Sequence, residues 1–298
     1  MTHMASVKDW IEGARLRTLP AALAPVVVGS AAAFHLGSWS APRALLALGV
    51  ALALQVGVNF ANDYSDGVRG TDDHRSGPPR LTGGGLVTPK VVLAAAWGCF
   101  ALAGVLGLVL LTLSGAWILL LAGMLAVLAA WFYTGGSHPY GYMGIGISEL
   151  MVFVFFGLLA TVGTTWTQAA SAPWWVWCLA SGMGLLSVDL LMANNLRDIP
   201  TDLESGKRTV AVRLGERGSR AAYALVLVGA LALAVVSMPT TPTRVGVFVV
   251  GAAAAVVPAR PVVTGATGRA LIPALRDTGL YALVWAATVA VALVLASA

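Results

Sequence analysis

The sequence predicts an all-α membrane protein, and two features of its composition carry that prediction. Hydrophobic residues make up 58% of the 298 positions, whereas charged residues make up only 10%. A soluble domain carries about 25% charged residues, so this chain has too few to cover a water-facing surface. The second feature is a set of runs without Asp, Glu, Lys or Arg, of which the longest cover residues 91–148 and 150–188. Each is long enough for two membrane-spanning helices of about 20 residues.

We expect a bundle of about nine transmembrane helices, because that number accounts for every long apolar run. All of them should be helical, since a backbone exposed to lipid must satisfy its own hydrogen bonds. The segment 1–17 precedes them and should lie in the membrane interface, because Val7, Trp10, Ile11 and Ala14 share one helical face. The expected spans cover, roughly, residues 18–36, 43–66, 89–111, 115–133, 146–168, 173–196, 220–237, 243–258 and 277–296.

The distribution of positive charge predicts the orientation in the membrane. With these spans, 16 of the 18 Lys and Arg residues fall on one side, and only Arg43 and Arg244 fall on the other. Positive residues gather on the cytoplasmic side of membrane proteins. We therefore expect a multi-pass protein of the cell membrane with its N-terminus in the cytoplasm and its C-terminus outside. The net charge of +5 reflects this bias and does not indicate nucleic-acid binding.

Two acidic regions, at residues 59–73 and 194–209, follow the second and the sixth expected span. In the first, Asn59, Asn62, Asp63 and Asp66 are spaced i, i+3, i+4 and i+7, which places them on one helical face. In the second, Asn194, Asp198 and Asp202 are spaced i, i+4 and i+8, again on one face. Pro200 interrupts the second stripe, and we expect it to bend or end the helix there.

Oxygen ligands at these spacings suit a hard divalent cation. Magnesium is usually held by a few carboxylates together with phosphate oxygens of a substrate. Two facing stripes would hold bridging magnesium ions with a diphosphate between them, and the nearby cations for its oxygens are Arg69, Arg197, Lys207 and Arg208. The alternative is a set of solvated loop charges. It explains poorly why like charges, which repel at i, i+4, are clustered twice with asparagines in phase.

Three stretches of the sequence are NDYSDGVRGTD, GPPRLTGGGLVT and NNLRDIPTDLESGKRTVAVRLG. Together they resemble the UbiA superfamily of intramembrane prenyltransferases. Within the superfamily, the naphthoate branch of menaquinone synthesis is the most similar. Four further features resemble this branch: ARLRTLPAALAPVVVG at residues 14–29, Tyr133-Thr-Gly-Gly, the pair Tyr140 and Tyr142, and the region of Glu149. The resemblance runs over most of residues 14–215.

The resemblance implies a single intramembrane domain over residues 1–298: a nine-helix bundle around a central cavity, with lateral access to lipid and cytoplasmic capping loops. It implies Mg²⁺-dependent transfer of a polyprenyl group from polyprenyl diphosphate to 1,4-dihydroxy-2-naphthoate, with loss of carbon dioxide, to give demethylmenaquinone. The active site would lie near the cytoplasmic face and hold two magnesium ions. Prenyl chain length and oligomeric state do not follow from the sequence.

The residues that match the family's motifs inherit expected roles. The catalytic aspartates would be Asp63, Asp66, Asp198 and Asp202. The metal ligands would be Asn62, Asp63, Asp66, Asp72, Asn194, Asp198 and Asp202. The diphosphate would contact Asn59, Arg69, Arg197 and Lys207. One departure is that Gly70 stands where the general pattern repeats an aspartate, so the third ligand of the first motif is either Asp72 or Asp73.

One tyrosine of the first acidic motif and several residues near or just after the fourth–fifth connection are candidates for the acceptor or for stabilising an allylic cation, which aromatic faces attract. They are Tyr64, Tyr133, Tyr140, Tyr142 and Glu149. An interfacial aromatic belt is the alternative for the tyrosines, and a helix cap is the alternative for Glu149. For Asp189, deep in the sixth span, we favour a structural role as a protonated, hydrogen-bonded group over a functional one.

Three other functions fit parts of the sequence. A prenyltransferase with another aromatic acceptor, such as 4-hydroxybenzoate, shares both acidic motifs. A phosphatidyl alcohol transferase has a DxxDG core like Asp63–Gly67, but Val68-Arg69 and the second acidic region do not fit it. A cation-coupled transporter would place its carboxylates near the bilayer midplane, where only Asp189 is expected.

Overall fold

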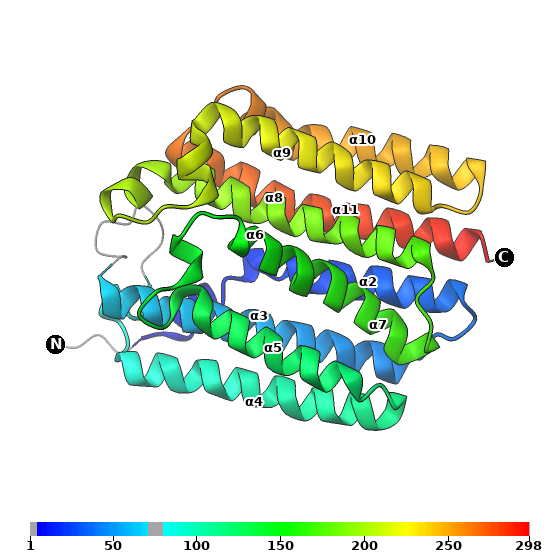
Figure 1. Ribbon diagram of the computed structural model, residues 1–298, viewed down its shortest axis with the longest axis horizontal. Helices are drawn as coiled ribbons and strands as arrows, with labels where there is room; N and C mark the ends of the chain where they lie inside the picture. Colours follow the sequence, from blue (N-terminus) through cyan, green and yellow to red (C-terminus); the bar gives the residue numbers. More distant parts are fainter. Residues whose placement is uncertain (1–4, 71–79, 298) are drawn as a thin grey trace.

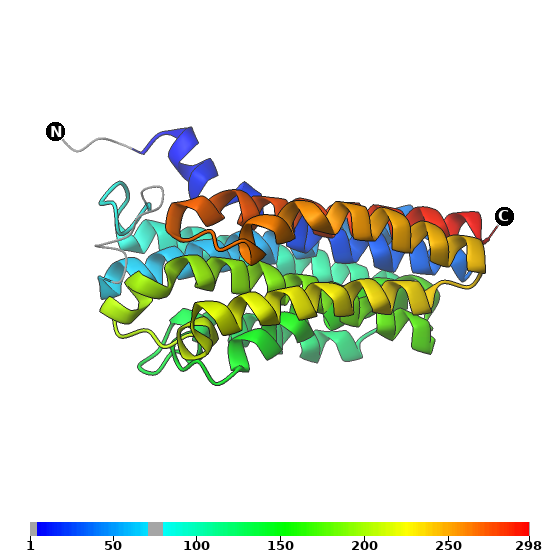
Figure 2. The ribbon, with the colours of Figure 1, turned by 90° about the horizontal axis from the view of Figure 1, so that it is seen from above.

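The computed structural model describes residues 5–70 and 80–297, and in this part of the chain it is all-helical. Long helices run side by side in alternating directions, and α11 ends at the opposite end of the bundle from α1 (Figures 1 and 2). Its elements are α1 (Val7–Gly13), η1 (Leu16–Thr18), α2 (Pro20–His35), α3 (Ala41–Arg69), α4 (Pro89–Ser114), α5 (Ile118–Thr134), η2 (Tyr140–Tyr142), α6 (Ile147–Val152), η3 (Phe153–Leu159), α7 (Ala160–Ala169), α8 (Trp174–Glu204), α9 (Val210–Ser237), α10 (Thr241–Val263), η4 (Gly268–Leu271) and α11 (Ile272–Leu295).

Seven helical segments of the described chain are long and apolar enough to cross a membrane. An eighth results if the bent pair Val7–Thr18 and Pro20–His35, which meet at 49°, forms one span. The remaining apolar helix, α5, has 17 residues. The prediction of a helical membrane bundle is thus confirmed, whereas the number nine and the cytoplasmic capping loops stay predictions.

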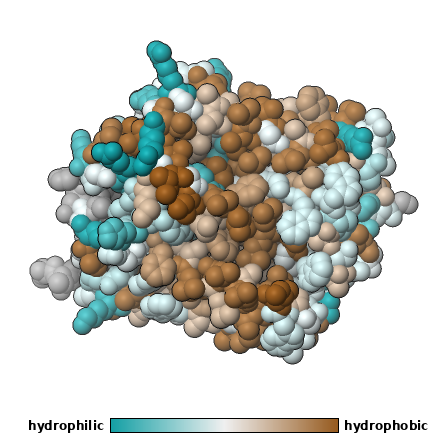
Figure 3. Space-filling model, in the orientation of Figure 1, coloured by the Kyte–Doolittle hydropathy of each residue, from teal (hydrophilic) through white to brown (hydrophobic). Residues whose placement is uncertain are grey.

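The surface of the bundle is suited to lipid. Large apolar side chains such as Leu225 and Ile118 are 74% and 71% exposed. On the face seen in Figure 3, apolar residues cover the middle of the bundle. Hydrophilic residues gather mainly toward the end that holds the last turns of α3 and α8 (Figures 1 and 3). An apolar middle with polar ends is the pattern of a protein whose solvent is the bilayer.

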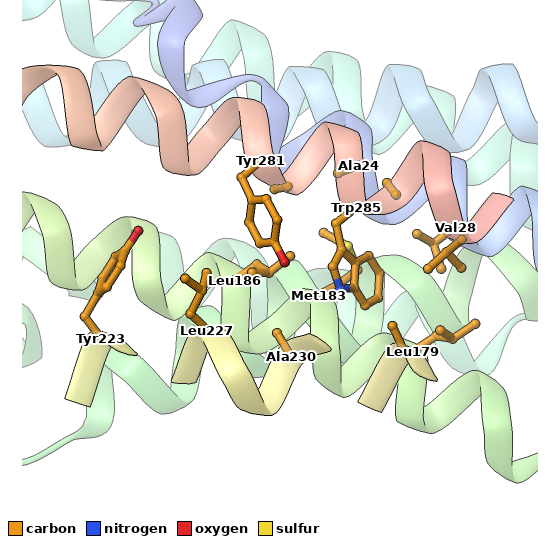
Figure 4. Close-up of a cluster of buried hydrophobic side chains, with 14 of the residues drawn as sticks. Ala24, Val28, Leu179, Met183, Leu186, Tyr223, Leu227, Ala230, Tyr281 and Trp285 are labelled. Carbon is orange, nitrogen blue, oxygen red and sulfur yellow. The ribbon is translucent and has the colours of Figure 1, made fainter. Parts of the chain in front are cut away.

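The largest buried cluster lies between α2, α8, α9 and α11, where Met183, Leu186, Tyr223 and Trp285 are almost fully buried (Figure 4). Glycines bring helices close together around it. A Cβ placed on Gly157 would lie 2.3 Å from the Cα of Gly184, so the π-helical segment η3 and α8 approach backbone to backbone. Small residues serve this purpose in membranes, where helices associate by close packing.

At the end of the bundle opposite the acidic stripes, one side chain joins three chain segments. Arg43, near the start of α3, donates to the carbonyl oxygens of Thr167 at 3.2 Å, Gln168 at 3.4 Å and Leu113 at 2.5 Å. These carbonyls belong to the last turns of α7 and α4, where the helix leaves them without an internal partner. Arg43 therefore caps two helices while it belongs to a third.

We expected Pro200 to bend or end the helix. It does not end it, because α8 continues through Pro200 to Glu204. Pro200 is exposed, and the helix goes on for only four residues beyond it. The second acidic stripe is consequently helical over its whole length, as its spacing requires.

Candidate active site

The first acidic stripe occupies the last turns of α3, which ends at Gly70 in the left-handed conformation with φ 74°. Asn59, Asn62 and Asp63 are buried, Asp66 is half-buried and Arg69 is exposed. Polar side chains in a membrane helix are costly unless they face protein partners or a polar cavity. The contacts of each residue show which partners these are.

Asp63 is fully buried and binds the segment that follows residues 71–79 in the chain. Its two carboxylate oxygens accept hydrogen bonds from the backbone N–H groups of Leu81 at 3.0 Å and Thr82 at 2.8 Å. Gly67, one turn further along α3, allows the same close approach, because a Cβ there would lie 2.5 Å from Thr82. Asp63 thus anchors this segment to α3, a contact between residues 18 positions apart that no local pattern reveals.

The amide side chain of Asn59 faces the N-terminal segment and not the carboxylates of the stripe. Its amide nitrogen donates to the carbonyl oxygen of Ala14 at 2.9 Å and to the hydroxyl of Thr18 at 3.0 Å. Gln55, one turn earlier on α3, also donates to Thr18 at 3.0 Å. Gln55 was not among the predicted residues, although its position four residues before Asn59 puts it in phase with the stripe. The predicted contact of Asn59 with diphosphate stays a prediction.

The α5–α6 connection packs against the stripe from the other side. Asn62 accepts a hydrogen bond from the hydroxyl of Thr134 at 2.8 Å, and Asp66 accepts one from the hydroxyl of Tyr142 at 2.6 Å. Arg69 donates to the carbonyl oxygen of Gly136. Thr134 was not among the predicted site residues. It lies within the Tyr133-Thr-Gly-Gly motif, and this motif could have identified it from the sequence.

The second acidic stripe lies on the last turns of α8. The guanidinium of Arg197 binds both carboxylate oxygens of Asp198, at 2.7 and 2.5 Å, and the side-chain oxygen of Asn194 at 2.9 Å. Asp202 is buried, accepts a hydrogen bond from Thr209 at 3.4 Å, and lies 3.8 Å from the ammonium group of Lys207. The predicted cations Arg197 and Lys207 therefore do meet the carboxylates of their own motif.

Tyr142 brings the two stripes together. Its ring centroid lies 5.9 Å from the guanidinium carbon of Arg69 and 5.2 Å from the ammonium group of Lys207. Its carbonyl oxygen accepts a hydrogen bond from the backbone N–H of Arg208 at 3.1 Å. Since the Tyr142 hydroxyl also binds Asp66, one residue contacts both motifs. Motifs that are separated by about 130 residues of sequence share one site at one end of the bundle.

Other predicted aromatic residues divide between the site and its surroundings. Tyr133 lies within electrostatic reach of the carboxylates of Asp66, Asp202 and Glu149. Tyr140 stacks edge-on against Tyr133 and donates to the carbonyl oxygen of Ala129 at 2.7 Å. Burial raises the pKa of Tyr140 to about 12, so its hydroxyl stays a donor at neutral pH. Tyr64 instead packs with a separate apolar cluster of α3 and α4.

Glu149 lies in the first turn of α6, where its charge is favourable to the helix dipole. One of its carboxylate oxygens is buried and has no hydrogen-bond partner within the described residues. A buried acceptor without a partner costs about 1–3 kcal/mol, so this oxygen is available to a bound molecule. No side chain makes a capping hydrogen bond at the start of α6, and the acceptor contact of Glu149 stays a prediction.

Asp189 lies outside this site. It precedes Asp198 by nine residues, which is two and a half helical turns, so it faces the other side of α8. It is completely buried, neither of its oxygens has a hydrogen-bond partner within the described residues, and it is within electrostatic reach of Tyr223 and Tyr281. The hydrogen bond expected from the sequence is therefore not found among the described residues, although the position on the far side of α8 places Asp189 away from the site.

The described residues contain no group of three or more His, Cys, Asp or Glu side chains that could hold a metal ion by themselves. Asp72 and Asp73 lie outside the described residues. The donors that are present are carboxylate and amide oxygens with cations beside them, which is the set that magnesium uses when phosphate oxygens complete its coordination. The described donors therefore fit magnesium that is held together with a diphosphate.

Fold and site together define a polytopic membrane protein that gathers carboxylates, amides and cations at one end of a helical bundle. The model of the UbiA prenyltransferase family matches residues 22–269. The chain belongs to this family and is an enzyme, a membrane prenyltransferase. The family membership excludes the transporter and the phosphatidyl alcohol transferase that the sequence had left open.

Curated relatives are similar over most of the chain. A 1,4-dihydroxy-2-naphthoate octaprenyltransferase of Mycobacterium tuberculosis is 53% identical over 292 residues, which cover 97% of this chain and 98% of the relative. The protein of the same name from Escherichia coli K12 is 39% identical over 235 residues, which cover 77% of this chain and 76% of the relative.

Solved structures share the fold at low sequence identity. A UbiA homologue from Aeropyrum pernix superposes with a TM-score of 0.72 at 16% identity and covers 93% of this chain and 98% of its own. A UbiA homologue from Archaeoglobus fulgidus, bound to DMAPP and Mg²⁺, superposes with a TM-score of 0.67 at 14% identity, with 96% and 99% of the two chains covered.

Proposed function

We propose that this enzyme transfers a polyprenyl group from polyprenyl diphosphate to 1,4-dihydroxy-2-naphthoate, with loss of carbon dioxide, to form demethylmenaquinol, the hydroquinone form of demethylmenaquinone. The observation that carries the proposal is the junction of both acidic motifs through Tyr142. The relatives named for this reaction, at 53% and 39% identity, support the acceptor. The structural neighbour with DMAPP and Mg²⁺ supports the diphosphate donor and the metal.

Asp63, Asp66, Asp198 and Asp202, with Asn62 and Asn194, would hold magnesium together with the diphosphate, and we propose two ions. Bound magnesium supplies Lewis-acid stabilisation of the departing diphosphate. Arg69, Arg197 and Lys207 contribute cations for the diphosphate oxygens, and Asn59 a contact at its edge. Arg197 and Lys207 are paired with the carboxylates of Asp198 and Asp202, so both cations already lie beside the proposed metal ligands.

The acceptor attacks the prenyl carbon through the ring carbon that carries its carboxylate. A carbon–carbon bond forms as the carbon–oxygen bond to diphosphate breaks and diphosphate leaves with that electron pair. Loss of carbon dioxide then returns an electron pair to the ring and restores its aromaticity. Tyr133 and Tyr140 present aromatic faces near the carboxylates and stabilise the positive charge that develops on the allylic group. The free oxygen of Glu149 orients an acceptor hydroxyl.

A competition assay tests the acceptor. Purified protein with Mg²⁺ and a polyprenyl diphosphate receives equal amounts of 1,4-dihydroxy-2-naphthoate and 4-hydroxybenzoate, and the products are identified by mass. The carboxyl carbon of each acceptor carries an isotopic label. We expect the naphthoate product to dominate and to have lost this label. Preference for 4-hydroxybenzoate, or a product that retains the label, would refute this acceptor and leave the family assignment intact.

We also propose that the chain forms one domain in the cell membrane, with the active site and the N-terminus at the cytoplasmic face and the C-terminus outside. The charge bias of 16 to 2 supports this orientation. Labelling of single cysteines introduced at the two ends, with a reagent that does not cross the membrane, tests it. Only the C-terminal cysteine should react in intact cells, and equal labelling of both ends would contradict the orientation.

A further inference from the structure

Tyr142 makes contacts of three different kinds, and each kind reaches a different part of the site. Its hydroxyl donates to Asp66 of α3 at 2.6 Å. Its ring lies beside Arg69 of α3 and Lys207, which follows α8. Its carbonyl oxygen binds the backbone of Arg208. The neighbouring Tyr140 differs, since its hydroxyl donates to a backbone carbonyl of α5 and its ring packs on Tyr133.

The hydroxyl contact fixes the carboxylate of Asp66. Hydrogen bonds from a hydroxyl to a carboxylate are short and strong, and a 2.6 Å bond to one oxygen limits the rotation of the whole group. The second oxygen of Asp66 then points in a defined direction. Partners that orient a metal-binding carboxylate in this way typically account for about 10–100-fold in metal affinity or activity.

The ring contact acts on the cations of both motifs. Arg69 and Lys207 repel each other, yet both lie within 6 Å of the same ring, whose negative face attracts them. Lys207 in turn lies 3.8 Å from Asp202. A continuous chain of contacts therefore runs from Asp66 through Tyr142 and Lys207 to Asp202, from the first acidic motif to the second.

We propose that Tyr142 is a positioning residue that sets the two acidic motifs at the separation a magnesium–diphosphate complex requires. This role differs from the acceptor or carbocation contact expected from the sequence, and it rests on the proposed function of the site. The hydroxyl aligns Asp66, and the ring holds Arg69 and Lys207 where they meet the diphosphate oxygens. Tyr142 acts through these residues and does not itself contact the reacting atoms.

The test separates the hydroxyl from the ring. Tyr142→Phe removes the bond to Asp66 and keeps the ring, whereas Tyr142→Leu removes both. Tyr223→Phe is the control, because it also loses a 2.7 Å hydrogen bond of a buried tyrosine but lies in the α9–α11 core. Binding of Mn²⁺ in the presence of inorganic pyrophosphate is measured by electron paramagnetic resonance, without turnover, on variants with unchanged thermal stability.

We expect Tyr142→Phe to weaken Mn²⁺–pyrophosphate binding about tenfold, Tyr142→Leu to weaken it further, and Tyr223→Phe to leave it unchanged. In an Asp66→Asn background, Tyr142→Phe should have almost no additional effect, since coupled residues are not additive. Equal binding by wild type and Tyr142→Phe, or full additivity with Asp66→Asn, overturns the inference. If wild type itself binds no Mn²⁺ with pyrophosphate, the proposed function fails instead.

Discussion

Asp63 accepts a hydrogen bond from the backbone N–H of Leu81 at 3.0 Å, and the peptide bond that supplies this N–H is the one between Arg80 and Leu81. Leu81 is 1% exposed and packs against Phe60 and Gly13, so the segment is held at its start by a carboxylate and by apolar contact. An aspartate expected to bind metal thus also determines where the chain re-enters the fold after residues 71–79.

The first prediction concerns this anchor. In the Asp63→Ala variant, trypsin should cleave the Arg80–Leu81 bond about tenfold faster than in wild type. The reason is that the loss of two hydrogen bonds to a buried carboxylate costs about 1–3 kcal/mol, so the segment opens more often. Cleavage fragments identified by mass give the rate. Asp198→Ala, in the second acidic motif on α8, should lose activity without faster cleavage; similar cleavage in both variants would argue against the anchor.

The second prediction concerns the metal. Chelation of divalent cations should abolish activity, and added Mg²⁺ should restore it. Asp66→Ala and Asp198→Ala should each lower kcat/KM by more than about 100-fold, since even the outer partners of metal ligands are worth about 10–100-fold. Prenyl transfer by a well-folded double variant in the presence of chelator would remove magnesium from the mechanism.

The third prediction concerns Asp189. A carboxylate at this depth is expensive to ionise, so a neutral group should replace it at little cost. Asp189→Asn should keep kcat/KM within about twofold of wild type, because the residue faces α9 and α11 and not the site. Asp198→Asn, assayed in parallel, should lose most activity. A large loss for Asp189→Asn, without a change in thermal stability, would assign this residue a catalytic role.

The fourth prediction concerns the contact between η3 and α8. Gly157→Ala should destabilise the protein by about 1–3 kcal/mol, because its Cβ would meet the backbone of Gly184 at 2.3 Å. Gly123→Ala in α5 is the matched control, since a Cβ there has no neighbour within 4 Å. Thermal unfolding in detergent compares the two variants with wild type. Equal melting temperatures would show that η3 and α8 separate easily.

The sequence predicted the helical bundle and both acidic stripes because these features are local. Charge-free runs locate the membrane helices, and the i, i+4 spacing of Asp198 and Asp202 requires one helical face. The expected membrane spans end near residues 66 and 196, and α3 and α8 continue beyond them to Arg69 and Glu204, as the helical spacing of the two stripes requires.

The partners of the site residues could not be predicted, because they are distant in sequence. Asp66 and Tyr142 are 76 residues apart, and Asn62 and Thr134 are 72 apart. Asn59 illustrates the difference: its phase with the stripe was visible, yet its amide donors bind the N-terminal segment. A pattern on one helix gives the face on which a side chain lies but not the segment that packs against that face.

The three hydrogen bonds of Arg43 have a mechanical consequence for a lipid-soluble substrate. They tie the ends of α4 and α7 to the start of α3 on the side of the bundle away from the acidic motifs. Separation of α7 or α4 from α3 at this rim would break hydrogen bonds of a charged guanidinium, which are worth about 1.5–3 kcal/mol each. Any spreading of these helices to admit a long prenyl chain is therefore smallest at the far rim.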